Sequence, residues 1–341
     1  MISSDPAREE EVDPKQHMMV MIGAYRISAF IGAASKLGIP DFLAENPKTT
    51  EELARLTGTH AHSLHRMLRF LACFGVFTLK DGFWTLTPLA RMLCSDIEGS
   101  LGPMAIMAAE PWHWSVWGNV AHTIKTGEPA FRHLHGTGTF EFFDNNPEAA
   151  QIFQRTMASF GVEDVSLVRE AFEFGGVRTV VDVGGGNGTF ICAFLHRYPG
   201  LSAILLDLPH VICGAKNVVR RERLEERCTL FAGDFFRSIP TGDVLIIKNV
   251  IHDWSDQEAG LILHNCREAL APDGRLLLVE YLVSEDNEPD PAIIMDGIML
   301  VMESGRERTE EEFRKLLRQE RFEVVKITPS HGRSVIEAKP M

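Results

Sequence analysis

The stretch Asp182-Val183-Gly184-Gly185-Gly186-Asn187-Gly188-Thr189 decides the fold. Glycines let the backbone adopt positive φ and let a ligand approach without a Cβ in the way. A dinucleotide fingerprint requires glycines at relative positions 1, 3 and 6, and counting from Gly184 the sixth position is Thr189. The stretch therefore predicts a ligand-binding turn at the end of a strand. The ligand that it predicts is not a dinucleotide.

Five apolar runs with helical stretches between several of them surround this turn. The runs cover residues 179–183, 202–207, 228–232, 243–248 and 275–280. Continuous apolar strands that alternate with helices indicate a doubly wound α/β sheet that is covered on both faces. A helix over Glu310–Glu320 and two further strands, 322–327 and 334–337, complete the expected domain, residues 176–341.

Residues 17–175 are expected to form a mainly helical domain. Met18–Leu37 is apolar and carries few charges, which is typical of a helix buried within its domain or against another chain. A helix capped by Thr49 or Thr50, a second helix over 61–74 and a hairpin around Asp81-Gly82 give the outline of a winged helix. The winged helix has only six basic and three acidic residues between 47 and 94, which favours packing or dimerisation over DNA binding.

Bulk composition indicates a protein of the cytoplasm. The chain has 341 residues, 45% of them hydrophobic, and a net charge of −13, which argues against a general nucleic-acid or anionic-membrane binder. Residues 1–16 are polar and acidic, so we expect a disordered tail there and no signal peptide. We expect no membrane span, because no apolar stretch is expected to reach the ~18 residues that one requires. The six cysteines form no C-x-x-C pair.

Carboxylates follow two further strands of the predicted sheet. Asp207 ends the second strand, where an acid can accept hydrogen bonds from two ribose hydroxyls. Asp234 and Phe235 follow the third, where they can bind an adenine amino group and cover the ring. Together with G-x-G-x-G, these residues predict that the ligand is S-adenosylmethionine, which is cationic at sulfur and suits a surplus of carboxylates.

His252 follows the fourth strand and is expected to face the same crevice. An imidazole can take the proton of an attacking hydroxyl. A carboxylate that holds the ring would fix its tautomer, and the residues alone leave three candidates, Asp253, Glu280 and Glu307.

Five ordered motifs make the chain resemble the plant-type and bacterial small-molecule O-methyltransferases, from about residue 18 to the end. The motifs are Val-Asp-Val-Gly-Gly-Gly-Asn-Gly (181–188), Asp-Leu-Pro-His-Val-Ile (207–212), Gly-Asp-Phe-Phe (233–236), Ile-His-Asp-Trp-Ser-Asp (251–256) and Gly-Arg-Glu-Arg-Thr (305–309). The resemblance implies a metal-independent enzyme with His252 as general base. It favours Glu280 and Glu307 as the acids that bracket this histidine, with Asp253 shaping the turn.

The resemblance also implies the other site residues and the assembly. Cofactor contacts are expected at Gly184, Gly186, Asp207, Leu208, Asp234, Phe235 and Lys248. Acceptor contacts are expected at Phe153, Met157, Met295 and Met299, although these four could equally be ordinary core residues. Members form homodimers through the N-terminal helices and place the acceptor pocket between the two domains.

The predicted activity is methylation of a hydroxyl, a phenol in our expectation, on an aromatic small molecule, with S-adenosylhomocysteine as the second product. Two alternatives stay open. Some proteins that resemble this chain use S-adenosylmethionine for hydroxylation, decarboxylation or pericyclic chemistry. A winged-helix regulator that senses the cofactor is the alternative from a different class.

Overall fold

The structure is a computed structural model that describes residues 13–284, 289–330 and 332–341. The chain divides into two compact units, one up to Pro111 and one from Trp112 onward. Each unit has a hydrophobic core of its own.

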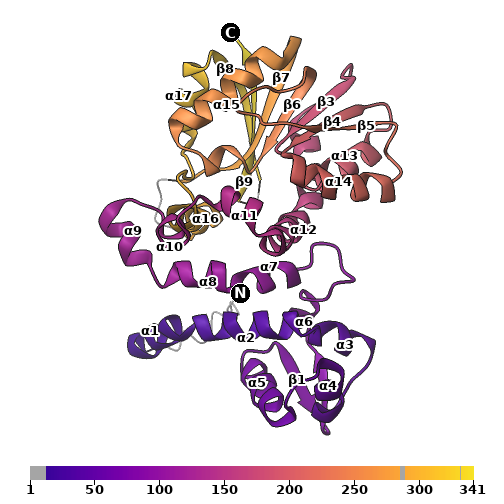
Figure 1. Cartoon of the computed structure of the whole chain (residues 1–341), viewed down its shortest axis with the longest axis vertical. Helices are drawn as coiled ribbons and strands as arrows, with labels where there is room; N and C mark the ends of the chain where they lie inside the picture. Colours follow the sequence, from indigo (N-terminus) through magenta and orange to yellow (C-terminus); the bar gives the residue numbers. More distant parts are fainter. Residues whose placement is uncertain (1–12, 285–288, 331) are drawn as a thin grey trace, which may run out of the picture. The chain divides into compact units, whose positions relative to one another are not determined.

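The first unit combines helices with one small hairpin (Figure 1). Its elements are α1 (Pro14–Gly23), α2 (Tyr25–Lys36), α3 (Ile39–Glu45), α4 (Thr50–Thr57), α5 (Ala61–Cys73), β1 (Phe77–Lys80), β2 (Phe83–Leu86), α6 (Pro88–Arg91) and α7 (Gly102–Ala109). Thr49 and Glu52 form a capping box that begins α4, and Gly58 ends it in the left-handed conformation. Asp81 and Gly82 both have positive φ, as a two-residue hairpin turn requires. The predicted winged-helix outline is confirmed.

The end of the expected disordered tail, residues 1–16, overlaps a helix. Residues 1–12 lie outside the described residues, whereas Asp13 caps α1 by accepting a hydrogen bond from the backbone N–H of Lys15. The helix therefore begins at Pro14, inside the range expected to be a tail. Proline suits the first turn of a helix because its missing N–H would be unpaired there anyway.

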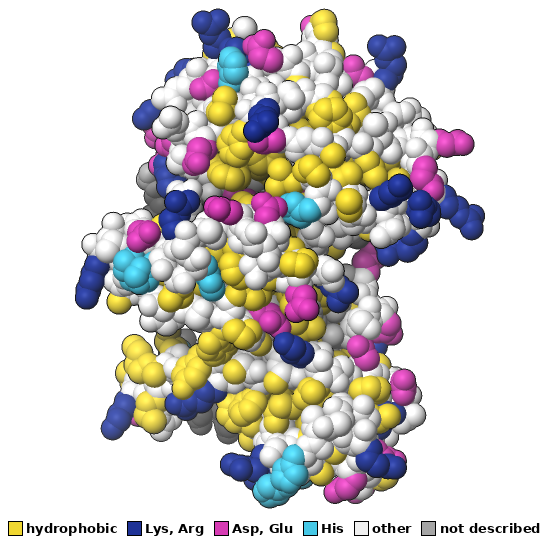
Figure 2. Space-filling model, viewed as in Figure 1, with side chains coloured by type: hydrophobic (Ala, Val, Ile, Leu, Met, Phe, Trp, Pro, Cys, Tyr) yellow, Lys and Arg dark blue, Asp and Glu magenta, His cyan; other side chains and the backbone are white. Residues whose placement is uncertain are grey.

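Helices α1 and α2 together form a long apolar segment. They follow one another directly, and Pro14–Lys36 spans 23 residues with a mean hydropathy of 1.4 and 11% of its most apolar window buried. Its length and composition alone would allow it to cross a membrane, so the expectation that no apolar stretch is long enough is wrong. Hydrophobic side chains gather on this part of the first unit (Figure 2). Five consecutive ones are exposed: Met18, Met19, Val20, Met21 and Ile22.

The second unit is built on a seven-stranded sheet. Its helices are α8 (Pro111–Trp117), α9 (Val120–Thr126), α10 (Ala130–His135), α11 (Thr139–Asn145), α12 (Pro147–Ala171), α13 (Thr189–Arg197), α14 (Pro209–Arg221), α15 (Asp256–Ala269), α16 (Pro291–Met302) and α17 (Glu310–Gln319), with a 3-10 turn at Ile251–Asp253. Its strands are β3 (Thr179–Val183), β4 (Ser202–Asp207), β5 (Cys228–Ala232), β6 (Gly242–Lys248), β7 (Leu270–Tyr281), β8 (Phe322–Pro329) and β9 (Arg333–Pro340).

The sheet has the order β5-β4-β3-β6-β7-β9-β8. The first five of these are parallel, and β9 and β8 join as an antiparallel edge. Alternate strand residues feed two cores: Val180, Leu205 and Ile246 pack with α12, α13 and α14, while Val181, Leu206 and Leu245 pack with α15 and α17. Both faces are covered, which confirms the doubly wound fold (Figure 1).

The expected division near residue 175 differs from the division into compact units. Helices α8–α12 group with the sheet because α10 contacts α16 and α12 contacts α13 and β9. A boundary near residue 175 therefore falls inside the second unit.

Candidate functional site

The glycine turn after β3 forms one wall of a pocket of about 310 Å³, a volume typical of small-molecule sites. Gly184 and Gly186 have φ of 71° and 61°, which side-chain-bearing residues rarely adopt. A Cβ built on Gly184 would approach Val250 to 2.8 Å, whereas one on Gly186 would meet no atom within 4 Å. The space beside Gly186 is therefore open, and together with its place in the pocket wall this makes the turn a cradle for a closely approaching ligand.

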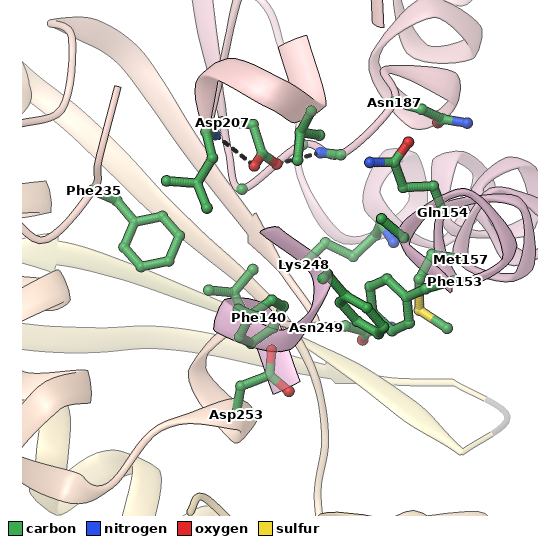
Figure 3. Close-up of a pocket in the computed structure, with 18 of the residues that line it drawn as sticks. Phe140, Phe153, Gln154, Met157, Asn187, Asp207, Phe235, Lys248, Asn249 and Asp253 are labelled. Atoms are coloured by element: carbon green, nitrogen blue, oxygen red, sulfur yellow. Dashed lines mark hydrogen bonds between the residues drawn. The ribbon is translucent and has the colours of Figure 1, made fainter. Parts of the chain in front are cut away.

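Asp207 closes the turn from the end of β4. Its Oδ2 accepts a hydrogen bond from the Gly186 N–H at 2.7 Å, and its Oδ1 accepts one from the Leu208 N–H at 2.7 Å (Figure 3). Burial raises the pKa of Asp207, and these two N–H groups oppose that rise. Each carboxylate oxygen keeps a further lone pair, so Asp207 can also accept hydrogen bonds from a diol.

Asp234 and Phe235 form the third part of the same wall, after β5. Both line the pocket, and the Phe236 N–H donates to Asp234 Oδ1 at 2.9 Å, which orients the carboxylate. The Phe235 ring contacts Phe236 and Trp254 with centroid separations of 4.9 and 6.1 Å. The pocket thus offers an acceptor for an amino group beside an aromatic face.

Lys248 lines the pocket from the end of β6. Its Nζ lies 3.5 Å from Oδ2 of the buried Asp164 on α12, which also forms a two-pronged ion pair with Arg333 at 2.8 and 3.0 Å. The ammonium is therefore held against α12. Every cofactor residue that the sequence predicts lines this pocket: Gly184, Gly186, Asp207, Leu208, Asp234, Phe235 and Lys248.

Aromatic side chains form the other part of the pocket. The Phe140 ring stacks on Trp254 with a centroid distance of 5.6 Å, and Phe143 contacts Phe153 at 4.8 Å. Phe153 and Met157 line the pocket as predicted. Met295 and Met299 on α16 are not among its lining residues, and Met299 is buried.

His252 lies behind this wall, in the 3-10 turn after β6. Its Nδ1 is 2.6 Å from Glu307 Oε1 and 3.8 Å from Glu280 Oε2, while its Nε2 is 3.5 Å from Asp253 Oδ1. The side chain is 6% exposed and does not itself line the pocket, but Asp253 does. Three acids thus surround the ring. Asp253 does more than shape the turn, because it lies beside Nε2, the ring nitrogen that Glu307 does not contact.

The acids make His252 strongly basic. Burial lowers the pKa of His252, but the charges of Asp253, Glu280 and Glu307 outweigh that effect and raise it to about 10. Burial also raises the pKa of Glu280 to about 7 and that of Asp253 to about 6, against the opposing charge of His252. The group therefore stabilises a proton on the imidazole.

Two residues that the sequence reasoning did not assign hold this turn in place. The fully buried Arg308 donates hydrogen bonds to the carbonyls of Ile251 and Trp254 at 3.0 and 2.9 Å. Gly305 lies against the backbone of residues 252–254, where a Cβ would collide. Both belong to the motif 305–309, from which only Glu307 was assigned a role, so the signal was present in the sequence.

Glu280 joins the turn that contains His252 to the sheet. It is fully buried at the end of β7, and its Oε1 accepts hydrogen bonds from the N–H groups of Val250 and Ile251 at 3.2 and 2.8 Å. Glu307 is in turn placed by its own N–H, which donates to Asp296 on α16 at 2.9 Å. Strand and helix thus orient the acids before any ligand binds.

The doubly wound sheet, the glycine cradle and the acids at successive strand ends define a methyltransferase of the Rossmann-like class. Comparison with known families matches residues 117–323 to the O-methyltransferase domain and residues 19–96 to the O-methyltransferase dimerisation domain. The chain belongs to this O-methyltransferase family.

Individual relatives agree with this assignment. The phenazine O-methyltransferase PhzM of Lysobacter antibioticus is 38% identical over 327 residues, which are 95% of this chain and 96% of that protein. The crystal structure of LaPhzM matches with a TM-score of 0.93 at 37% identity and covers 97% of this chain and 100% of its own.

The O-methyltransferase NcsB1 from neocarzinostatin biosynthesis, solved with S-adenosylmethionine and 2-hydroxy-5-methyl naphthoic acid, matches with a TM-score of 0.79 at 29% identity. The match covers 92% of this chain and 96% of that one. The family and the cradle together identify the cofactor of this chain as S-adenosylmethionine.

Proposed function

We propose that this enzyme methylates a phenolic hydroxyl of an aromatic secondary metabolite and that His252 is the general base. The observation that carries the proposal is the buried His252–Glu307 pair, 2.6 Å apart, directly behind an aromatic-lined pocket that adjoins the glycine cradle. Such a strongly held base has no purpose in mere cofactor sensing. The same pair favours methyl transfer over the non-methylating alternatives, which have less need of a base.

The cofactor supplies a methyl group on a positively charged sulfur, so the leaving group requires no acid. The fit is supported by the open space over Gly186 and by the acceptors on Asp207 and Asp234. We infer that Asp207 binds the ribose diol, Asp234 the adenine amino group, and Phe235 the face of the ring. Gly184, Leu208 and Lys248 complete this set, with Lys248 contributing through its backbone.

His252 removes the one proton that the reaction releases. Because Glu307 accepts the proton of Nδ1, the neutral ring has its lone pair on Nε2, the nitrogen beside Asp253. The hydroxyl oxygen forms its bond to the methyl carbon as the carbon–sulfur bond breaks, and its proton passes to Nε2. The three acids then stabilise the imidazolium.

Orientation is the second contribution of the chain. Holding two reactants in line can account for up to about 7–11 kcal/mol of a barrier, and a positioned base for about 10²–10⁴-fold in rate. The stacked rings of Phe140 and Trp254, with Phe153 and Met157, provide flat apolar surfaces for an aromatic acceptor. Met295 and Met299 remain proposed acceptor contacts.

The exposed apolar face of α1 and α2 supports a homodimer over membrane insertion. Residues 19–36 of this segment lie within the match to the dimerisation domain, and a second copy of the chain would cover the exposed apolar side chains of residues 18–22. We accordingly propose a cytoplasmic homodimer that needs no metal and binds neither nucleic acid nor membrane. Sedimentation of the protein with and without lipid vesicles separates the dimer from a membrane-bound form.

A panel of phenols tests the proposed activity. Incubation with S-adenosylmethionine should give products about 14 mass units heavier together with an equal amount of S-adenosylhomocysteine, and EDTA should not reduce the yield. If no phenol in a broad panel is methylated while the cofactor still binds, the proposed reaction is wrong.

A further inference from the structure

Asn249 follows β6 directly and lies in a turn whose backbone is held by hydrogen bonds. Its φ is 51°, a left-handed conformation that asparagine tolerates better than most residues. Its N–H donates to the Val279 carbonyl at 3.0 Å, and the next two N–H groups donate to Glu280. Hydrogen bonds to β7 therefore hold the backbone at Asn249 and at the two residues after it.

The half-buried Asn249 has one buried side-chain acceptor, its Oδ1 atom. The residue lines the pocket, and its Oδ1 is buried without a hydrogen-bond partner among the described residues. Figure 3 shows Asn249 and Phe140 together in the lower middle of the view with Asp253 below them, whereas Asp207 lies above them and Phe235 to the left. An unpaired buried acceptor is destabilising, so this position favours a ligand atom that donates a hydrogen bond.

The acceptor molecule is the ligand that can supply this donor. Asn249 comes three residues before the proposed base His252 and lies on the side of the Phe140 ring, while Asp207 and Asp234 are the residues proposed to bind the ribose diol and the adenine amino group. We propose that Asn249 is a specificity-determining residue that accepts a hydrogen bond from a second hydroxyl or amino group of the aromatic acceptor. This inference rests on the proposed methylation of a phenol.

The charges around the pocket favour such a donor over a carboxylate on the acceptor. Asp253 lines the same part of the wall as an acid. The cationic lining residue Lys248 is drawn toward Asp164, and His210 lies 3.0 Å from Asp144. The expected acceptor is therefore a flat, uncharged aromatic molecule that has a donor group next to the hydroxyl that is methylated.

Two acceptors that differ in one hydroxyl test the assignment. The first is an ortho-dihydroxy aromatic compound taken from the phenol panel, and the second has the same ring with a single hydroxyl. We expect wild-type enzyme to prefer the dihydroxy acceptor by about 10–100-fold in kcat/KM, in line with the loss of one buried hydrogen bond.

The variant Asn249→Gly removes the amide and keeps the positive φ without strain. It should reduce the preference to about twofold or less, through slower methylation of the dihydroxy acceptor alone. Asn249→Asp keeps an acceptor oxygen and should restore part of the preference. Gln154→Ala removes another amide from the wall of the same pocket and should leave the preference intact.

The outcomes are distinguishable. A preference that survives in Asn249→Gly, or an equal loss for both acceptors, overturns the role of Asn249 but leaves the proposed function standing. Wild-type enzyme that methylates both acceptors equally also overturns it. A wild type that methylates no phenol refutes the proposed function and this inference together. Thermal unfolding of each variant identifies any loss that reflects misfolding.

Discussion

The cofactor wall and the base cluster of this enzyme are built in opposite ways. The cofactor wall, defined by Gly184, Gly186, Asp207, Asp234 and Phe235, lines the pocket and comes from consecutive strand ends. The base cluster consists of the buried His252, Glu280 and Glu307 together with Asp253, which lines the pocket, and it joins three separate segments.

This difference separates binding from chemistry. The wall offers unfilled acceptor positions and open space, so changes there should act on cofactor affinity. The cluster consists of charged groups that are already paired with one another, so changes there should act on the rate of proton transfer and on its pH dependence. Variants in one region should leave the property of the other region nearly unchanged.

Replacing the base should have the largest effect. His252→Ala is expected to lower turnover by roughly 10²–10⁴-fold, because the substitution removes the ring nitrogen that is proposed to accept the hydroxyl proton. The affinity for S-adenosylhomocysteine, measured by calorimetry, should stay within about threefold. His252→Asn, which keeps a donor toward Glu307, guards against a folding defect, and His196→Ala on the exposed face of α13 is the matched control. Unchanged turnover in His252→Ala would remove the assigned base.

Replacing Asp207, the proposed ribose-binding acid, should weaken cofactor binding more than it slows turnover. Asp207→Ala loses the charged acceptor, which is worth about 1.5–3 kcal/mol, so the Kd for S-adenosylhomocysteine should rise by roughly 10–100-fold. Asp243 is the matched control because it also accepts hydrogen bonds from two backbone N–H groups, those of Arg178 and Thr179. If Asp243→Asn weakens cofactor binding as much as Asp207→Ala does, the effect is structural and not a ribose contact.

Removing one acid from the cluster should move the pH profile. Only neutral His252 accepts a proton, and with its pKa raised to about 10 the neutral fraction grows as pH rises. Activity should therefore increase from pH 7 toward pH 10 in the wild type. Glu307→Gln removes a charge that raises this pKa, so the rise should occur at lower pH, while the plateau falls by about tenfold because the imidazolium is less stabilised. A profile that coincides with that of the wild type would show that Glu307 does not tune the base.

The same contrast explains what could be predicted from the sequence. The cofactor wall was predictable because each residue lies in a motif at a strand end, and parallel strands bring their carboxyl ends to one edge. The proposed base, His252, was predictable from its place after a strand, but its burial was not. Burial of His252 and the place of Asp253 depend on how Gly305 and Arg308 pack against the turn, more than 50 residues further along the chain.

The helical region shows the same limit. The separate helices and the hairpin follow from caps and turn residues, but the grouping of α8–α12 with the sheet depends on packing between distant segments. Local signals therefore predict elements well, whereas the boundary between units and the acceptor side of the pocket require the folded structure.

The smallest effect is expected at Phe235. Variants of this residue test how the cofactor wall binds adenine. The ring lines the pocket and contacts Phe236 and Trp254, so its proposed role is to cover adenine by apolar contact alone. A methionine is flexible and polarizable and can cover the same face. Phe235→Met should therefore raise the Kd for S-adenosylhomocysteine by about threefold or less and leave the pH profile unchanged, whereas Phe235→Ala, which exposes that face to water, should raise it by about tenfold. A large loss in Phe235→Met would mean that the aromatic character of the ring, and not its apolar surface, binds the adenine.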